Sequence, residues 1–254
     1  MPATDKLLTK TEGSIAHLLL NNAARLNALD HEMLLDIERC FAEWERKSAI
    51  TVVVLGPASD RAFCVGADIE VLSRMNEQSM QAWELLGNRV LDRIESSPLI
   101  SVASIPGYAL GGGLTLAAAC DFRICAADAI LGQPEIGLGW IPGWGGVARL
   151  SRLIGIGRAK ELCMTGRRIT AQEGELAGLV NRVVDADQLS VKSAEFASEL
   201  ASQDRAALRG IKVLAESQVS GVAAHSFDGL LNASLLHNER AQAAVAKFLA
   251  RKKT

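Results

Sequence analysis

Residues 105–121 read IPGYALGGGLTLAAACD, with three consecutive glycines, Gly111, Gly112 and Gly113, at the centre. The apolar, β-branched residues 100–105 predict a buried strand before the glycines, and the Ala- and Leu-rich residues from about 114 predict a helix after them. Three glycines in a row are costly in chain entropy, so we expect them where the backbone approaches another group closely. Backbone N–H groups at a helix N-terminus favour a negatively charged oxygen. The stretch therefore predicts an anion or oxyanion site in a strand-to-helix turn.

A second glycine-containing turn lies upstream, where residues 62–69 read AFCVGADI. Gly66 precedes Ala67 at the predicted opening of another helix. Two backbone N–H donors that converge on one oxygen form an oxyanion hole. Each turn is a weak motif alone, but the two turns in this order, followed by QPE at 133–135 and IPG at 141–143, make a specific combination.

The composition is that of a folded globular protein with ample core, because 49% of the 254 residues are hydrophobic and 22% are charged. A formal net charge of −2 and the lack of a long basic run give no sign of a nucleic-acid or anionic-membrane partner. The five cysteines show no CxxC spacing, so we expect reduced thiols and no metal site. No signal core or membrane-length apolar stretch is present, and we expect a cytoplasmic protein.

Strand and helix patterns alternate in the first two-thirds of the chain, and helical patterns alone fill the last third. Asp30 is expected to cap a helix over residues 31–47, and Pro98 to end a helix over 80–94. Gly56-Pro57 is expected to stop a strand over 51–55. We expect an α/β fold with one core over residues 1–185 and an all-helical region over 186–254. The remaining expected elements are strands at 6–10, 15–20, 100–105, 121–126, 130–132 and 182–184, and helices near 114, 146–150, 158–164, 171–177, 187–200, 205–217 and 225–249.

With these motifs the chain resembles the enoyl-CoA hydratase/isomerase (crotonase) superfamily along nearly its whole length. The resemblance implies a spiral of ββα units followed by a helical region that takes part in trimerisation and active-site closure. It also implies assembly as a homotrimer or hexamer, an acyl-CoA thioester as substrate, and no cofactor beyond the coenzyme A of that substrate. The matching segments are 21–29, 62–69, 106–113, 120–122, 132–139, 141–143, 164–166, 171–174 and 178–181.

The resemblance implies that the thioester carbonyl lies between the N–H groups of Ala67 and Gly112, where an enolate is stabilised. Glu135 falls on the family's second catalytic glutamate, and a desolvated carboxyl there suits proton transfer. Thr115 departs from the family, because two-glutamate hydratases carry the first glutamate at this position. A hydroxyl cannot act as a general base near neutral pH. Thr115 is either a hydrogen-bond partner of water or substrate, or a helix residue on the core side.

Substrate contacts are implied for a further set of residues. Trp140 is expected to form an aromatic wall of the acyl pocket, whereas Trp144 is expected to pack in the core. Phe248 and Arg251 resemble a C-terminal aromatic and basic pair that approaches the CoA phosphates. The other positions expected to contact substrate or CoA are Arg25, Leu26, Asp68, Ile69 and Gly143.

Several functions remain open. The first is isomerisation or hydration of an enoyl-CoA with Glu135 as the single acid/base. The second is hydratase-lyase or decarboxylase chemistry on a substituted acyl-CoA. The third is a non-catalytic scaffold that binds acyl-CoA. A serine-protease relative is disfavoured because no serine stands in the glycine turn and all four histidines lie outside the motifs. A dinucleotide-binding turn is disfavoured because the third glycine of GxGxxG is missing after Gly111.

Overall fold

Between residues 52 and 132 of the computed structural model, successive strands fall alternately in a long sheet and in a short sheet. The structure describes residues 2–216 and 242–243. The long sheet has the spatial order β1 (Leu7–Glu12), β2 (Ile15–Leu20), β3 (Val52–Pro57), β5 (Ile100–Ile105), β7 (Phe122–Ala126) and β10 (Arg182–Val184). The short sheet has the order β4 (Ala62–Cys64), β6 (Tyr108–Leu110), β8 (Ile130–Gly132) and β9 (Arg168–Thr170).

Helices follow each pair of strands, which produces the expected ββα repeat. Strands β3 and β4 lead to α2 and α3, strands β5 and β6 lead to α4, and strands β7 and β8 lead to α5 and α6. The β1–β2 hairpin and the β8–β9 pair are antiparallel, and the other pairings are parallel. The helices are α1 (His31–Glu45), α2 (Ile69–Leu72), α3 (Glu77–Ser96), α4 (Gly112–Ala118), α5 (Gly146–Ile154), α6 (Ile156–Thr165), α7 (Ala171–Ala177), α8 (Leu189–Ala201) and α9 (Arg205–Glu216), with 3-10 turns at Ala23–Arg25, Pro134–Leu138 and Ala186–Gln188.

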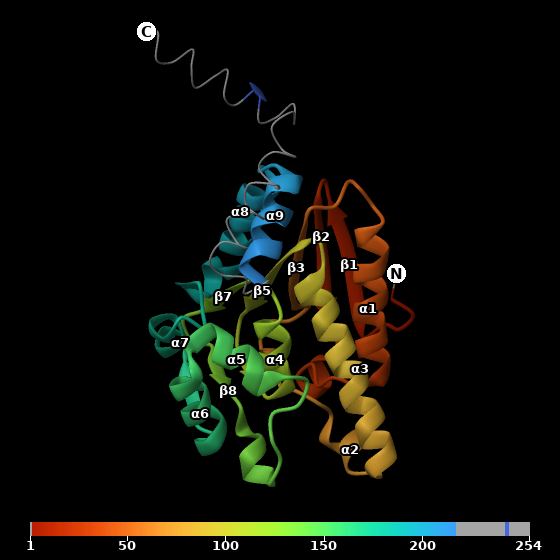
Figure 1. Cartoon of the computed structure of the whole chain (residues 1–254), viewed down its shortest axis with the longest axis vertical. Helices are drawn as coiled ribbons and strands as arrows, with labels where there is room; N and C mark the ends of the chain where they lie inside the picture. Colours follow the sequence, from red (N-terminus) through yellow and green to blue (C-terminus); the bar gives the residue numbers. More distant parts are fainter. Residues whose placement is uncertain (1, 217–241, 244–254) are drawn as a thin grey trace, which may run out of the picture. The chain divides into compact units, whose positions relative to one another are not determined.

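Helix α1 begins where the sequence predicts. The side chain of Asp30 accepts a hydrogen bond from the N–H of Met33, which satisfies one of the free donors of the first turn. One face of α1 is buried, and α1 packs beside α3 next to the first strands of the long sheet (Figure 1). Asn76 and Ser79 form a capping box that starts α3 three residues earlier than the apolar pattern indicates.

Two expectations about elements are wrong, and three strands were not expected. Strand β3 continues through Gly56 to Pro57 instead of stopping before them, and Pro57 forms its last residue. Helix α4 begins at Gly112, inside the glycine triplet, and not near residue 114. The three-residue strands β4, β6 and β9 went unrecognised, although β8 and β10, of the same length, were expected; β4 (AFC) and β6 (YAL) contain no β-branched residue.

The chain divides into two compact units, Met1–Ser198 and Glu199–Thr254. The first unit contains both sheets and one continuous core of aliphatic and aromatic side chains. The boundary expected between residues 185 and 186 stays a prediction. No helix of the described residues is both long and apolar enough to cross a membrane.

Candidate active site

The short sheet brings the three predicted motifs together. Strands β4, β6 and β8 are parallel neighbours, so their carboxyl ends lie at one edge of the sheet. The chain leaves β4 into Val65–Ala67, leaves β6 into Gly111–Gly113, and leaves β8 into Gln133–Glu135. Ligands of α/β sheets bind at this kind of edge, outside the carboxyl ends of the strands. The residues that the sequence predicts to act together therefore meet because of strand order.

Each glycine of the triplet has a different close neighbour. A Cβ atom on Gly111 would lie 2.9 Å from Oε1 of Glu135, and Gly111 also holds a positive φ of 54°. A Cβ on Gly112 would lie 2.6 Å from the ring of Trp144. A Cβ on Gly113 would lie 2.2 Å from the carbonyl oxygen of Cys64 at the end of β4. None of the three positions has room for a side chain. This explains why the chain has glycine at all three, although glycine loses more conformational entropy on folding than any other residue.

The two expected oxyanion donors are adjacent and unused. Gly66 packs against the start of α4, since a Cβ on Gly66 would lie 3.1 Å from the nitrogen of Gly112. Leu29 bonds to the groups on either side of Ala67, donating to the carbonyl of Gly66 at 2.7 Å and accepting from Asp68 at 2.9 Å. Gly112 is the first residue of its helix, where an N–H has no partner within the helix. Within the described chain neither the Ala67 nor the Gly112 N–H donates a hydrogen bond.

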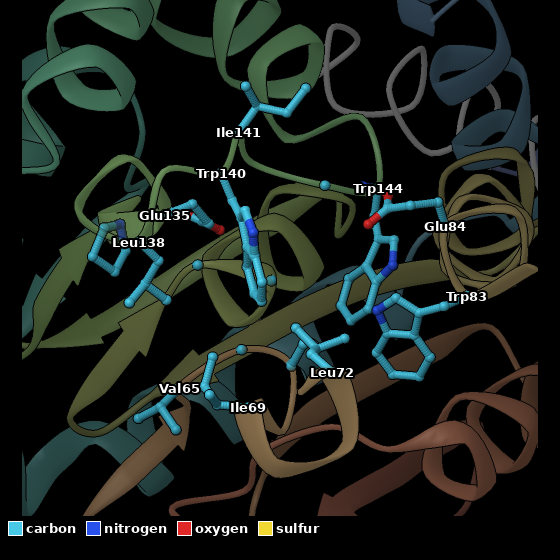
Figure 2. A pocket seen from close by; sticks show the side chains of 16 residues that line it. Val65, Ile69, Leu72, Trp83, Glu84, Glu135, Leu138, Trp140, Ile141 and Trp144 are labelled. Carbon is cyan, nitrogen blue, oxygen red and sulfur yellow. Dashed lines mark hydrogen bonds between the residues drawn. The ribbon is translucent and has the colours of Figure 1, made fainter. Parts of the chain in front are cut away.

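Ala67, Gly112 and Glu135 line one cavity of about 110 Å³, which we call the Glu135 cavity. Its wall is largely apolar and aromatic (Figure 2). The side chains that line it are Val65, Ile69, Leu72, Trp83, Glu84, Pro134, Glu135, Leu138, Trp140, Ile141 and Trp144.

Glu135 has the environment expected of an acid/base group. Burial raises the pKa of its carboxyl above the ordinary value, and the negative charge of Glu84 raises it further, while a hydrogen bond from its own backbone N–H acts in the opposite direction. The raised pKa increases the fraction of carboxylic acid that is available to donate a proton.

Gln133 connects Glu135 to Thr115. The side chain of Gln133 is fully buried, and one orientation of its amide satisfies all of its neighbours. In that orientation Nε2 donates to Oε1 of Glu135 at 3.0 Å and to Oε2 at 3.1 Å, and the Gln133 oxygen accepts from Thr115 Oγ1 at 3.1 Å. In the opposite orientation the Gln133 amide oxygen would face the Glu135 carboxylate oxygens, and neither group could donate a hydrogen bond. Thr115 is fully buried and is absent from the cavity wall, so its hydroxyl reaches the site through Gln133.

Both expected tryptophans line the cavity. Trp140 is 40% exposed, whereas Trp144 is 2% exposed and packs on Trp83 with ring centroids 5.2 Å apart. Trp144 therefore belongs to the core and to the cavity wall at once. Its φ of 53° is strained for a bulky residue. Its backbone is fixed from both sides, because its N–H donates to Glu84 Oε2 at 3.0 Å and its carbonyl accepts from Arg149 Nε at 3.2 Å.

The expected CoA contacts are only partly gathered at the cavity. Ile69 and Gly143 line it. Arg25 lies at a neighbouring hollow, where it pairs with Asp68 at 2.8 Å and with Glu70 at 2.9 Å. Leu26 has a left-handed φ of 51°. Phe248 and Arg251 lie outside the described residues.

The sequence did not single out three wall residues, Leu72, Trp83 and Glu84. Two of them are on α3, whose helical spacing is visible in the sequence, but which face of α3 meets the loop at residues 143–144 depends on tertiary packing. The described residues hold no cluster of three or more His, Cys, Asp or Glu side chains that could bind a metal ion.

Comparison with known proteins agrees with this architecture. The family model described as Enoyl-CoA hydratase/isomerase matches residues 10–254. A short-chain-enoyl-CoA hydratase of Clostridium acetobutylicum is 38% identical over 81% of this chain and 78% of its own length. A crotonyl-CoA hydratase of Syntrophomonas wolfei is 36% identical over 84% and 82%. The crystal structure of an enoyl-CoA hydratase from Bacillus anthracis superposes with a TM-score of 0.93 at 34% identity and covers 97% of both chains.

Proposed function

The chain belongs to the enoyl-CoA hydratase/isomerase family, and we propose that it adds water to the double bond of a short-chain 2-enoyl-CoA. The observation that carries the proposal is the pair of unused N–H groups, Ala67 and Gly112, in the same small cavity as Glu135. The names of two relatives, a short-chain-enoyl-CoA hydratase and a crotonyl-CoA hydratase, support the same reaction.

The two N–H groups polarise the thioester carbonyl. When water adds to the β-carbon, negative charge moves onto the thioester oxygen and forms an enolate. Donors that are already in place stabilise that charge without reorganisation, and loss of one such donor typically costs about 10²–10³ in rate. Because both donors are backbone groups next to glycines, the site needs no side chain for this task.

Glu135 moves the proton. In its carboxylic acid form it donates a proton to the α-carbon of the enolate, which completes the addition. Burial supports this role by keeping the carboxyl protonated to a higher pH than usual. Gln133 holds both carboxylate oxygens and so limits the directions in which the acid can point.

The size of the Glu135 cavity supports a short acyl group. A cavity of about 150 Å³ accommodates benzene, and the Glu135 cavity measures about 110 Å³. Trp83 and Trp144 narrow it from one side, with their rings packed on each other. A four-carbon acyl chain such as crotonyl fits this volume better than a long or aromatic one.

Coenzyme A is assigned to the surface beside the cavity. Ile69 and Gly143 would contact the thioester end, and Arg25, with Leu26 and Asp68, the more distant parts. Arg25 is already paired with Asp68 and Glu70, so binding of a CoA phosphate there requires Arg25 to exchange partners. Contacts from Phe248 and Arg251, and assembly as a homotrimer or hexamer, stay predictions.

Double-bond migration is the second candidate, and Thr115 is the observation that favours it. An isomerase moves one proton between two carbons and needs a single carboxylate, which Glu135 supplies. A hydratase also needs a base for water, and Thr115 cannot be one.

The test is an assay of the purified protein with crotonyl-CoA and with 3-butenoyl-CoA. The proposal expects 3-hydroxybutyryl-CoA from crotonyl-CoA, identified by mass and NMR. Conversion of 3-butenoyl-CoA to crotonyl-CoA with no hydration would replace the proposal with the isomerase.

A further inference from the structure

A second carboxylate lies in the Glu135 cavity. Glu84, on α3, lines the same cavity as Glu135, and its charge acts on the Glu135 carboxyl. Figure 2 shows the two side chains extending from opposite sides of the view, with the Trp140 ring between them and the Glu84 carboxylate beside the backbone at Trp144. Glu84 belongs to a helix that neither glycine turn contains, so the resemblance of the motifs gives it no role.

One oxygen of the Glu84 carboxylate is held by a hydrogen bond, and the other is not. Oε2 accepts the N–H of Trp144 at 3.0 Å. Gly143 leaves the room for this contact, because a Cβ there would lie 2.6 Å from Oε1 and 2.8 Å from Oε2. In the described part of the chain Oε1 accepts no hydrogen bond from another residue. A carboxylate held by one oxygen can accept a proton through the other from a water within hydrogen-bond reach.

Hydration needs such a group and Thr115 does not supply it. The reaction requires one group to remove a proton from water and another to deliver a proton to the α-carbon. Thr115 is a buried hydroxyl outside the cavity wall, and Glu135 serves the α-carbon under the proposed function. We infer that Glu84 is a catalytic base that activates the attacking water, in place of the carboxylate that is missing at Thr115. This inference rests on the proposed function.

The complete step balances with two carboxyl groups. Glu84 in its carboxylate form accepts a proton from water while the water oxygen bonds to the β-carbon. The π electron pair moves onto the thioester oxygen, where the N–H groups of Ala67 and Gly112 stabilise it. Glu135 in its acid form then protonates the α-carbon and gives 3-hydroxyacyl-CoA. Exchange of one proton with solvent by each carboxyl group restores the starting state.

A purely structural role for Glu84 has a different consequence. The same carboxylate fixes the strained backbone of Trp144, so removing the side chain would disturb the cavity wall. Glu84→Gln separates the two roles, because the amide oxygen of glutamine still accepts the Trp144 N–H but the amide cannot take a proton from water. Glu77→Gln is the matched control, since Glu77 is an exposed acid on the first turn of the same helix and outside the cavity.

The experiment measures two reactions for each protein: hydration of crotonyl-CoA, and exchange of the α-protons of butyryl-CoA with D₂O. The exchange needs the oxyanion hole and Glu135 but no activated water. The expected result for Glu84→Gln is a loss of hydration of about 10²-fold or more, typical of a lost general base. Loss of the Glu84 charge lowers the pKa of Glu135, so exchange is compared at the pH optimum of each protein, where it should stay close to the wild-type rate. Glu77→Gln is expected to match the wild type in both reactions, and Glu135→Gln to lose both.

Two results for Glu84→Gln overturn the inference alone: hydration at the wild-type rate, or an equal loss of hydration and exchange, which would show that Glu84 acts only through the shape of the site. A wild-type protein that exchanges α-protons and isomerises 3-butenoyl-CoA but hydrates nothing overturns the proposed function, and the inference with it.

Discussion

The carboxylate of Glu135 lies directly against the α-carbon of Gly111, so that a methyl group on Gly111 would come within 2.9 Å of Oε1. The first glycine of the triplet thus makes room for the acid, and the second carries an oxyanion donor. The position of the proposed acid and the position of the proposed oxyanion donor therefore depend on two consecutive residues, Gly111 and Gly112. Substitution of Gly111 therefore tests the placement of Glu135, whereas substitution of Gly112 or Gly113 would collide with Trp144 or with the Cys64 carbonyl.

Gly111→Ala is expected to displace Glu135. The positive φ at this position adds strain of about 1–3 kcal/mol for a residue with a side chain, and a misplaced catalytic group can cost about 10²-fold in rate. We expect kcat for hydration to fall by about that factor, together with a lower Tm. Gly157→Ala is the control, because a Cβ there meets nothing within 4 Å and its φ is not positive. A wild-type kcat for Gly111→Ala would contradict the inference that Gly111 makes room for the Glu135 carboxylate.

Gln133→Met is expected to free the Glu135 carboxyl. Methionine has a similar length but cannot donate to Oε1 and Oε2, so the ionised form loses its support and the pKa of Glu135 rises. The falling limb of the kcat/KM–pH profile should move to higher pH, and kcat should fall by about tenfold, roughly the effect of one lost hydrogen bond to a charged group. Thr115→Val should give a smaller change in the same direction, because Thr115 acts through Gln133. An unmoved profile in Gln133→Met would show that Gln133 does not hold Glu135.

The pH dependence of stability follows from the raised pKa of Glu135. Folding disfavours the ionised carboxyl, so Glu135 costs no stability below its unfolded pKa, near the ordinary value of 4.5; the cost grows as pH rises from there to the raised folded pKa and is constant above it. Glu135→Gln removes this cost. We expect its Tm to exceed that of the wild type at pH 7 and the difference to vanish near pH 4. A Tm difference that grows toward acid pH would have the wrong sign for a desolvated carboxyl.

Trp144→Leu is expected to enlarge the Glu135 cavity. The Trp144 ring fills the space between Trp83 and Gly112, so a smaller side chain leaves room for further methylene groups. One methylene in an apolar pocket is worth about 10–200-fold in kcat/KM. The ratio of kcat/KM for 2-hexenoyl-CoA to that for crotonyl-CoA should rise by about tenfold or more. Trp140→Leu, at a 40% exposed position, should cost less in Tm. An unchanged ratio for Trp144→Leu would place the acyl chain elsewhere.

The sequence predicts the local elements well where a single pattern determines them. The side chain of Asp30 caps the start of α1, and residues 100–105 form a buried strand, as expected. Strands β4 and β6 went unrecognised although they position the site, because neither contains a β-branched residue, whereas the equally short β8 and β10 do and were expected. The motifs compensate for this, because Gly66 and the glycine triplet directly follow β4 and β6, and Glu135 follows β8.

The part of the site that the sequence could not predict comes from α3. Helical spacing identifies the buried face of α3 but not the loop that meets Glu84. The role of Trp144 also needed the structure, since burial and lining of a cavity are alternatives in a sequence and coincide in the fold. Thr115 signalled that a carboxylate is missing, and only the packing of α3 against residues 143–144 shows where another one lies.

The central claim is that Glu135 carries the proton to and from the α-carbon of a thioester enolate held by Ala67 and Gly112. Its most direct measurement is the rate of deuterium incorporation from D₂O into the α-position of butyryl-CoA, followed by mass spectrometry, for the wild type and for Glu135→Gln. We expect incorporation by the wild type and a rate lower by about 10²–10⁴ in the variant, the usual contribution of a general acid/base. Equal incorporation by the two proteins would contradict the claim.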